Sequence, residues 1–526
     1  MSLQLPPTSV ATSVAIISGA PSGTRIFFRL VPSLEGERSR VRRPESGVSE
    51  TTCAYGFRRH PTPSAARLPR ARERLSVINC IAMNGPGDEQ RLIAKLTWRL
   101  IPFLCLCFLA AFLDRVNVGF AALQMQADLA FSDTVYSFGA GIFFIGYFLF
   151  EVPSNIILEK VGARLWIARI MIVWGIISSS MMFVSTPGMF YLLRFLLGAA
   201  EAGFFPGIIF YLTYWFPTAH RSRTVAMFMI APAMSGVVGG PLSGYLLDHH
   251  PASFQGWQWL FLIEGLPSVL LGIAVLFYLP NGPREAKWLR PQEIEWLTQR
   301  LADERAGREK HHALSLWRAL THPRVLLLSL IYFLVVIGAY GFDLFMPKIL
   351  ANAFPAASKS EIGWLAAVPP LASVFVMVFW GRRSDRLSER RWHVAWPALW
   401  AAVGLAVISF DVNPIVALIA AAVAVSGRWS CIPPFWALPT AFLSGTAAAG
   451  GIALINAVGN LGGFVGPFLM GWLSDLTGSY AVGLRVLAGA YVLGALIALA
   501  LTFDRAKPMV RSAKLFQRSS EAPSRT

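Results

Sequence analysis

Hydrophobic residues in this chain fall into long runs that short polar segments separate. A helix needs roughly 20 apolar residues to cross a bilayer, and only helices or closed barrels satisfy the backbone in lipid. The alternation of polar and apolar residues that is typical of barrel strands is absent. The pattern therefore predicts an all-α membrane protein with twelve transmembrane helices, at residues 98–122, 135–158, 165–184, 189–213, 224–247, 257–280, 324–347, 361–381, 393–411, 413–442, 449–474 and 482–504.

The second half of the chain repeats features of the first half. A Gly-Pro pair occurs near the end of the fifth predicted helix and recurs 226 residues later, and a glycine and an aspartate follow each copy. We therefore expect two six-helix halves, 83–280 and 324–505, related by a pseudo-twofold axis along the membrane normal, with the site between them. The repeated residues are Gly240, Pro241, Gly244 and Asp248, and then Gly466, Pro467, Gly471 and Asp475.

The segments outside the two halves are polar. Residues 1–82 are rich in Ser, Pro and Arg, and we expect them, like the tail 506–526, to be disordered. Residues 1–82 have three open interpretations: a start assigned too far upstream, with Met83 as the native start, an Arg-rich transit-like segment, or a genuine disordered tail.

The linker between the halves, residues 281–323, contains one amphipathic stretch. Pro291 stands at a predicted helix start, and Ile294, Leu297 and Leu301 follow along one stripe of a charged segment. We expect a helix that lies on the cytoplasmic face and tethers the two halves, with a partner-binding site as the alternative.

Charge supports the membrane interpretation. The chain is 55% hydrophobic and only 14% charged, with a formal net charge of +17. The cationic joints follow even-numbered helices, so the positive-inside rule predicts a multi-pass protein of the cell (inner) membrane with both termini cytoplasmic. Because most of the cationic residues lie in short loops beside helix ends, the positive charge does not indicate nucleic-acid binding. We expect a monomer that lies in the lipid bilayer.

No predicted helix carries a His pair, a Cys/His cluster or an HExxH motif, and no phosphate-binding GxxxxGK[ST] motif occurs. The sequence therefore predicts neither an enzyme nor a cofactor nor a metal site.

The fourth predicted helix places an arginine and an acid inside apolar sequence. Arg194 and Glu201 are seven residues apart, nearly two helical turns, so both project from one face. An ionisable side chain near the bilayer centre costs about 2.5–3.5 kcal/mol even on lenient scales, so such residues usually serve a substrate or proton pathway. A structural ion-pair lock between helices is the alternative.

The twelve predicted helices, their internal repeat and a short motif in two cytoplasmic loops together resemble the major facilitator superfamily. The cytoplasmic loop signature of that family is preserved as Gly381-Arg382-Arg383-Ser384-Asp385-Arg386, and a degenerate copy runs from Glu159 to Arg164. An acid near a helix end can pair with cations and a helix terminus, so we assign Glu159, Arg164, Gly381, Asp385 and Arg386 to gating of the cytoplasmic side.

Within that family the chain is most similar to the anion:cation symporters, which include tartrate, hydroxyphenylacetate, phthalate and sugar-acid permeases. The similarity covers about residues 90–505. The most specific stretches are Asp114 to Asn117, Arg194 to Gly207, Tyr211 to Arg223 and Phe435 to Gly466.

The resemblance implies roles for four charged residues. Asp114 and Glu201 match proton carriers, and Arg115 and Arg194 match arginines that handle the anion. Burial disfavours an ionised carboxylate whereas a nearby arginine favours it, so each acid is poised between taking a proton and pairing with the cation. Protonating the acid would free the guanidinium fork for a substrate carboxylate.

Weaker candidates also come from the resemblance. Tyr147, Trp436 and Asn456 match substrate contacts, although each could be ordinary packing, and Ala233 replaces a glutamine of such relatives, which indicates a less hydroxylated or differently shaped substrate. Arg428 interrupts an apolar run. It is either a second carboxylate anchor, which would favour a dicarboxylate such as tartrate, or an arginine that lies at the cavity mouth or snorkels to a headgroup.

Two further expectations follow from small residues and proline. Pro433 and Pro434 should break the tenth helix locally. The stretch from Gly236 to Gly244 resembles the antiporter signature of drug exporters, although close helix packing also explains it.

The expected function is therefore proton-coupled symport of a small organic anion, a carboxylate such as tartrate, with drug or organophosphate antiport as the alternative. The expected partners are the anion, protons and lipid.

Overall fold

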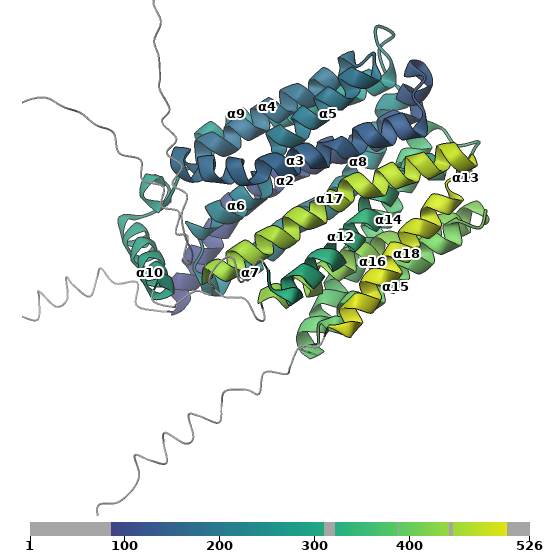
Figure 1. Cartoon of the computed structure of the whole chain (residues 1–526). Helices are drawn as coiled ribbons and strands as arrows, with labels where there is room; N and C mark the ends of the chain where they lie inside the picture. Colours follow the sequence, from purple (N-terminus) through teal and green to yellow (C-terminus); the bar gives the residue numbers. More distant parts are fainter. Residues whose placement is uncertain (1–85, 310–320, 388, 441–444, 502–526) are drawn as a thin grey trace, which may run out of the picture. The chain divides into compact units, whose positions relative to one another are not determined.

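The structure is a computed structural model, and it describes residues 86–309, 321–387, 389–440 and 445–501. The predicted disordered segments 1–82 and 506–526 lie outside these residues. In the described part every regular element is a helix, as the hydrophobic pattern predicts (Figure 1).

The described residues of the first half form eight α-helices, because two of the predicted spans are each built from two helices. A short 3-10 turn, η1 (Met181–Phe183), ends the third span. The linker contributes a second 3-10 turn, η2 (Pro283–Glu285), and the helix α10 (Pro291–Glu309). The helices are α2 (Pro86–Leu129), α3 (Asp133–Val161), α4 (Ala163–Ser180), α5 (Pro187–Glu201), α6 (Phe204–Thr213), α7 (Thr218–Phe228), α8 (Ile230–Asp248) and α9 (Gly256–Tyr278).

The second half repeats this plan. Its helices are α12 (Pro323–Asp343), α13 (Met346–Ala353), α14 (Lys359–Leu387), α15 (Arg391–Ile408), α16 (Pro414–Thr440), α17 (Gly445–Thr477) and α18 (Ala481–Ala500).

Eleven segments of the described chain are long and apolar enough to cross a membrane. Each coincides with one of the twelve predicted spans. The remaining span, the ninth, is α15, which carries Arg391, His393 and three tryptophans that lower its hydropathy. Because α15 packs along α16 and α18, it belongs to the same bundle, and the fold is that of an all-α membrane protein.

The repeated glycines lie where the two halves meet. A Cβ atom on Gly244 of α8 would meet the backbone oxygen of Lys359 on α14, and one on Gly471 of α17 would meet that of Asp133 on α3. The contacted residues are themselves 226 positions apart in the sequence. The internal repeat therefore becomes a pair of equivalent helix contacts, α8 with α14 and α3 with α17, across the interface.

The fourth span breaks at a position that the hydrophobic pattern does not predict. Helix α5 ends at Glu201, and Gly203 adopts φ +86° before α6 begins. A Cβ atom at this position would collide with the hydroxyl of Ser154, so only glycine fits. The break places Glu201 at the carboxyl end of a helix inside the bundle.

The break predicted at Pro433 and Pro434 is wrong, because α16 continues through both prolines to Thr440. Neighbouring helices can compensate for the hydrogen bonds that proline removes inside a membrane bundle. Phe435, directly after the two prolines, stacks on Tyr332 of α12 with ring centroids 5.1 Å apart.

The amphipathic linker helix exists and docks on the first half. Leu297 and Leu301 of α10 are buried, and Glu293 accepts a 2.7 Å hydrogen bond from Lys95 of α2. Burial alone would raise the pKa of Glu293, but the hydrogen bonds from Lys95 and Arg290 outweigh it and lower the pKa. These contacts fix one end of the linker, and a tether remains its predicted role.

Candidate functional site

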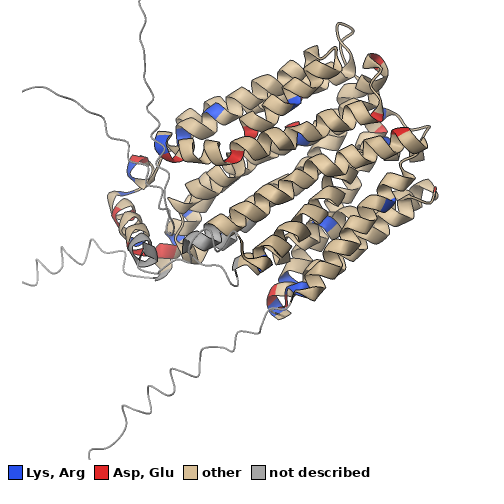
Figure 2. Cartoon of the chain, in the orientation of Figure 1, with Lys and Arg blue, Asp and Glu red and all other residues tan. Residues whose placement is uncertain are grey.

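Most charged residues lie at helix ends and on α10, but a few lie inside the bundle (Figure 2). Charges of this kind are rare in membrane spans and mark functional positions by default. The candidate site is built from them.

The central pair is Arg115 of α2 and Glu201 of α5, which form a buried salt bridge. Arg115 also donates a 3.1 Å hydrogen bond to the hydroxyl of Tyr340 on α12, in the other half. Its guanidinium lies 4.9–5.4 Å from the ring centroids of Phe112, Phe143 and Tyr147. The cation is thus held by one carboxylate, one hydroxyl and the faces of aromatic rings.

Arg194 is buried on the same helix as Glu201 but does not pair with it. Its Nη2 donates to the backbone oxygen of Ala140 at 3.1 Å, and the group lies 5.1 Å from the ring centroid of Phe143. Its Nε and Nη1 find no hydrogen-bond acceptor among the described residues. Because these donors are buried, they are positioned to hold an anionic group.

Asp114 differs from the sequence expectation. The expected pairing of each acid with a guanidinium holds for Glu201, but no arginine of the described chain lies within ion-pair distance of Asp114. Instead its two oxygens accept hydrogen bonds of 2.7–2.9 Å from Trp174, Ser178 and Ser268. These donors come from α4 and α9, so Asp114 is enclosed within the first half.

The three weaker candidates lie in aromatic and polar surroundings. Tyr147 is buried below Arg115. Asn456 of α17 donates a 2.8 Å hydrogen bond to Glu151 of α3, across the two halves. Trp436 packs edge-on against Tyr332 at 5.1 Å. Ala233, which the sequence comparison placed opposite a glutamine of sugar-acid permeases, is buried.

Arg428 of α16 forms a buried salt bridge with Asp343 at the end of α12. Its guanidinium also lies 4.6 Å from the ring centroid of Trp429. The snorkelling alternative is therefore wrong, because Asp343 and the ring of Trp429 hold the side chain inside the bundle. A carboxylate anchor stays the predicted role of Arg428.

Three acids in this region were not foreseen: Glu151, Glu264 and Asp343. Glu264 of α9 accepts a 2.6 Å hydrogen bond from Ser243, and Asn117 lies close to it. Each of these acids is an isolated charge in an apolar run, and this pattern could have identified them in the sequence as candidate site residues.

The residues assigned to gating do not join the two halves. Glu159 is exposed, Arg164 lies 4.0 Å from Glu285, and Asp385 pairs with Arg390 of its own half at 2.8 Å. The printed partners of Arg164 and Asp385 therefore leave the expected gating contacts between the halves unformed at these residues.

The halves are joined instead at the opposite end. Asp248 accepts a 2.7 Å hydrogen bond from the backbone N–H of Ser360, at the start of α14. Asp475 accepts from the N–H groups of Asp133 and Thr134, at the start of α3, at 3.1 and 2.8 Å. A salt bridge between Lys348 and Asp133 adds to the second contact.

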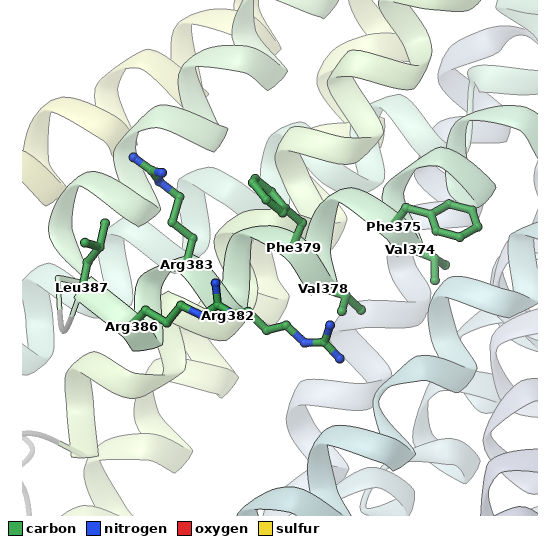
Figure 3. Close-up of a pocket in the computed structure, with 8 residues that line it drawn as sticks. All are labelled: Val374, Phe375, Val378, Phe379, Arg382, Arg383, Arg386 and Leu387. Atoms are coloured by element: carbon green, nitrogen blue, oxygen red, sulfur yellow. The ribbon is translucent and has the colours of Figure 1, made fainter.

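A hollow of about 660 Å³ lies along the end of α14 near its arginines (Figure 3). Arg382, Arg383 and Arg386 line it together with Phe375 and Phe379. All of its lining residues belong to α14, and neither Arg115 nor Glu201 lines it. The hollow is therefore a groove on α14 and not the candidate site.

Comparisons with known proteins agree with this architecture. The family model of the Major Facilitator Superfamily matches residues 104–355 and 328–524. A protein of Agrobacterium vitis named "Putative tartrate transporter" is 50% identical over 417 residues, which cover 79% of this chain and 95% of that protein. A protein of Acinetobacter baumannii named "Quinolone resistance transporter" is 42% identical and covers 78% of this chain and 94% of its own.

A solved structure shares the fold. The xylose transporter XylE from E. coli, in a partially occluded inward-open conformation, superposes with a TM-score of 0.62. The sequences are 15% identical, and the match covers 78% of this chain and 99% of that chain.

Proposed function

Because the chain belongs to the Major Facilitator Superfamily and is a membrane transporter, we propose that it is a proton-coupled symporter of a small organic anion, with tartrate as the leading candidate. The observation that carries the proposal is the buried pair of Arg115 and Glu201. A guanidinium that already holds one carboxylate is a preformed site for another.

The pair gives a rule for coupling. Glu201 and a substrate carboxylate cannot both occupy the fork of Arg115 unless an added proton neutralises one of them. Substrate binding at Arg115 therefore requires Glu201 to take up a proton. Asp114 has its own three donors, so in this scheme it acts as a neighbouring charge and not as a direct competitor for Arg115.

Arg194 supplies the second part of the site. Two of its buried nitrogens have no described acceptor, and it lies on the same helix face as Glu201. We assign it to the anion. The names of relatives support an anionic substrate, since the similar protein from Agrobacterium vitis is named for tartrate.

Alternating access follows from the way the halves are joined. Contacts at Asp248 and Asp475 hold one end together, and the basic loops lie at the other end. We propose that the joined end faces outward and that the basic loops and both termini are cytoplasmic. The cycle then breaks the outer contacts as the inner ones form.

The experiment uses purified protein in vesicles with labelled tartrate. Wild-type protein should accumulate tartrate when the outside is acidified, and Glu201→Gln should lose this accumulation while it retains exchange of tartrate across the membrane. Glu295→Gln, an exposed acid on α10, is the matched control and should behave as wild type.

Loss of both accumulation and exchange in folded Glu201→Gln would instead support a structural lock. Arg194→Lys should lose most uptake, because a point charge does not replace the planar fork. If wild-type protein ignores tartrate, a scan of sugar acids, phthalate and hydroxyphenylacetate identifies the anion.

Drug export is the second candidate, because a relative at 42% identity is named for quinolone resistance. The glycine motif from Gly236 to Gly244 is not specific evidence for drug export. Gly240 and Gly244 of α8 lie against the backbone of Gly363 and Lys359 on α14, so close packing accounts for them. Uptake by intact cells would support the symporter, and efflux from loaded cells would support the exporter.

A further inference from the structure

The buried charges inside the spans do not balance. Apart from the Asp133–Lys348 pair at the end of α3, the described bundle encloses five acids and three arginines. An uncompensated ion in a low-dielectric interior costs several kcal/mol, so an excess of two negative charges is strongly disfavoured. Two of the five acids should therefore be neutral. The acids are Asp114, Glu151, Glu201, Glu264 and Asp343, and the arginines are Arg115, Arg194 and Arg428.

The hydrogen bonds indicate which two are neutral. Glu201 and Asp343 each pair with an arginine, and Asp114 accepts three hydrogen bonds. Glu151 and Glu264 each accept a hydrogen bond at one oxygen, whereas the other oxygen has no partner among the described residues. A carboxyl group with an unused oxygen is the natural place for a proton.

These two acids differ in where they lie. Glu264 is bound to Ser243 within the first half. Glu151 is bound to Asn456 of the second half, and this hydrogen bond spans the interface that must open during transport. Of these two acids, Glu151 is the one whose described hydrogen bond must break when the halves separate.

The described groups that face Glu151 leave its carboxyl group without a cation as partner. Arg115 of α2, Tyr147 of α3 and Tyr332 of α12 interact with it electrostatically, and α17 contributes the amide of Asn456. The carboxylate of α5, Glu201, is already bound to Arg115. No described cation forms an ion pair with Glu151.

We propose that Glu151 is a further proton-carrying residue, whose neutral form is required for α3 and α17 to close together over the site. The inference rests on the proposed function, since it assigns part of the proton coupling to this residue. When the halves meet at this level, Glu151 is buried against Asn456 without a cation, so closure needs the proton. When they part, water reaches the carboxyl group and the proton can leave.

The substitution Glu151→Gln tests the assignment, because glutamine keeps the shape and the hydrogen bond to Asn456 but is always neutral. Tartrate exchange across the vesicle membrane should persist in this variant and lose its acceleration at low pH. Fewer protons should enter with each tartrate than in the wild type. Glu264→Gln is the matched control and should keep the wild-type pH profile.

An unchanged pH profile and proton stoichiometry in Glu151→Gln would overturn the proposal. A second measurement needs no substrate: infrared spectroscopy of the protein in lipid, which detects the carbonyl stretch of neutral carboxyl groups. Glu151→Gln should remove one such band, and an unchanged spectrum would also overturn the proposal. If the band disappears but wild-type protein does not move tartrate, the substrate assignment fails while the proton on Glu151 stands.

Discussion

The salt bridge between Arg115 and Glu201 makes a quantitative prediction about stability that does not depend on knowing the substrate. The exposed fractions of the two side chains are 11% and 3%, so the pair is almost completely desolvated. Removing one partner of such a pair costs about 3–5 kcal/mol, whereas replacing both by apolar residues is often neutral. The perturbation is therefore a double-mutant cycle of Arg115→Met and Glu201→Met.

The two single substitutions should not cost the same. In Arg115→Met the carboxylate keeps no described partner and must take a proton, which at pH 7 costs a glutamate about 3.7 kcal/mol. In Glu201→Met the guanidinium keeps Tyr340 and its aromatic rings, and each cation–π contact contributes about 0.5–2 kcal/mol. We therefore expect Arg115→Met to be the more destabilising change.

The assay is equilibrium unfolding in mixed lipid–detergent micelles at pH 7 and pH 5. The double variant should be destabilised by about 3 kcal/mol less than the sum of the single ones. The penalty of Arg115→Met should shrink by about 1.4 kcal/mol for each pH unit below 7. Additivity within about 0.5 kcal/mol, or a penalty that does not change with pH, would refute the reasoning.

Two further predictions concern the backbone and the linker. Gly203→Ala should destabilise the protein by more than about 1–2 kcal/mol, since φ +86° is unfavourable for alanine and its Cβ would meet Ser154. Gly188→Ala is the control and should cost little, because a Cβ there meets nothing within 4 Å. Thermal unfolding of the two variants tests this difference. Because the pKa of Glu293 is lowered in the folded protein, its contribution to docking of α10 is complete above the ordinary glutamate pKa and is lost as the pH falls through the lowered value. Hydrogen exchange in α10, corrected for the intrinsic effect of pH, should rise in that acidic range, whereas in Glu293→Gln it should be faster already at neutral pH and change little with acid.

The hydrophobic pattern predicted the helices well because lipid forces every span to be apolar and helical. Local conformation was harder to predict. The break at Gly203 depends on one close contact with Ser154 from another helix, and the continuity of α16 through its prolines depends on neighbours that the sequence does not place side by side.

The charged residues of the candidate site stand out in the sequence, whereas their partners do not. Arg115, Arg194 and Glu201 stand out as charges in apolar sequence. Arg194 and Glu201 are buried, and the side chain of Arg115 is only 11% exposed. The partners of Asp114 are a tryptophan and two serines on other helices, and side chains so common in a bundle carry no signal of their own. Tertiary packing alone decides which acid meets which cation.

The two aspartates at the joined end show how the halves of the chain depend on each other. Asp248 ends a helix of the first half and holds the start of α14 in the second, while Asp475 ends a helix of the second half and holds the start of α3 in the first. Such reciprocal exchange is the geometry of a symmetric dimer, in which each subunit completes its partner. A gene cut within the linker should therefore yield two polypeptides that find each other in the bilayer, whereas either fragment alone would leave a helix start without its carboxylate.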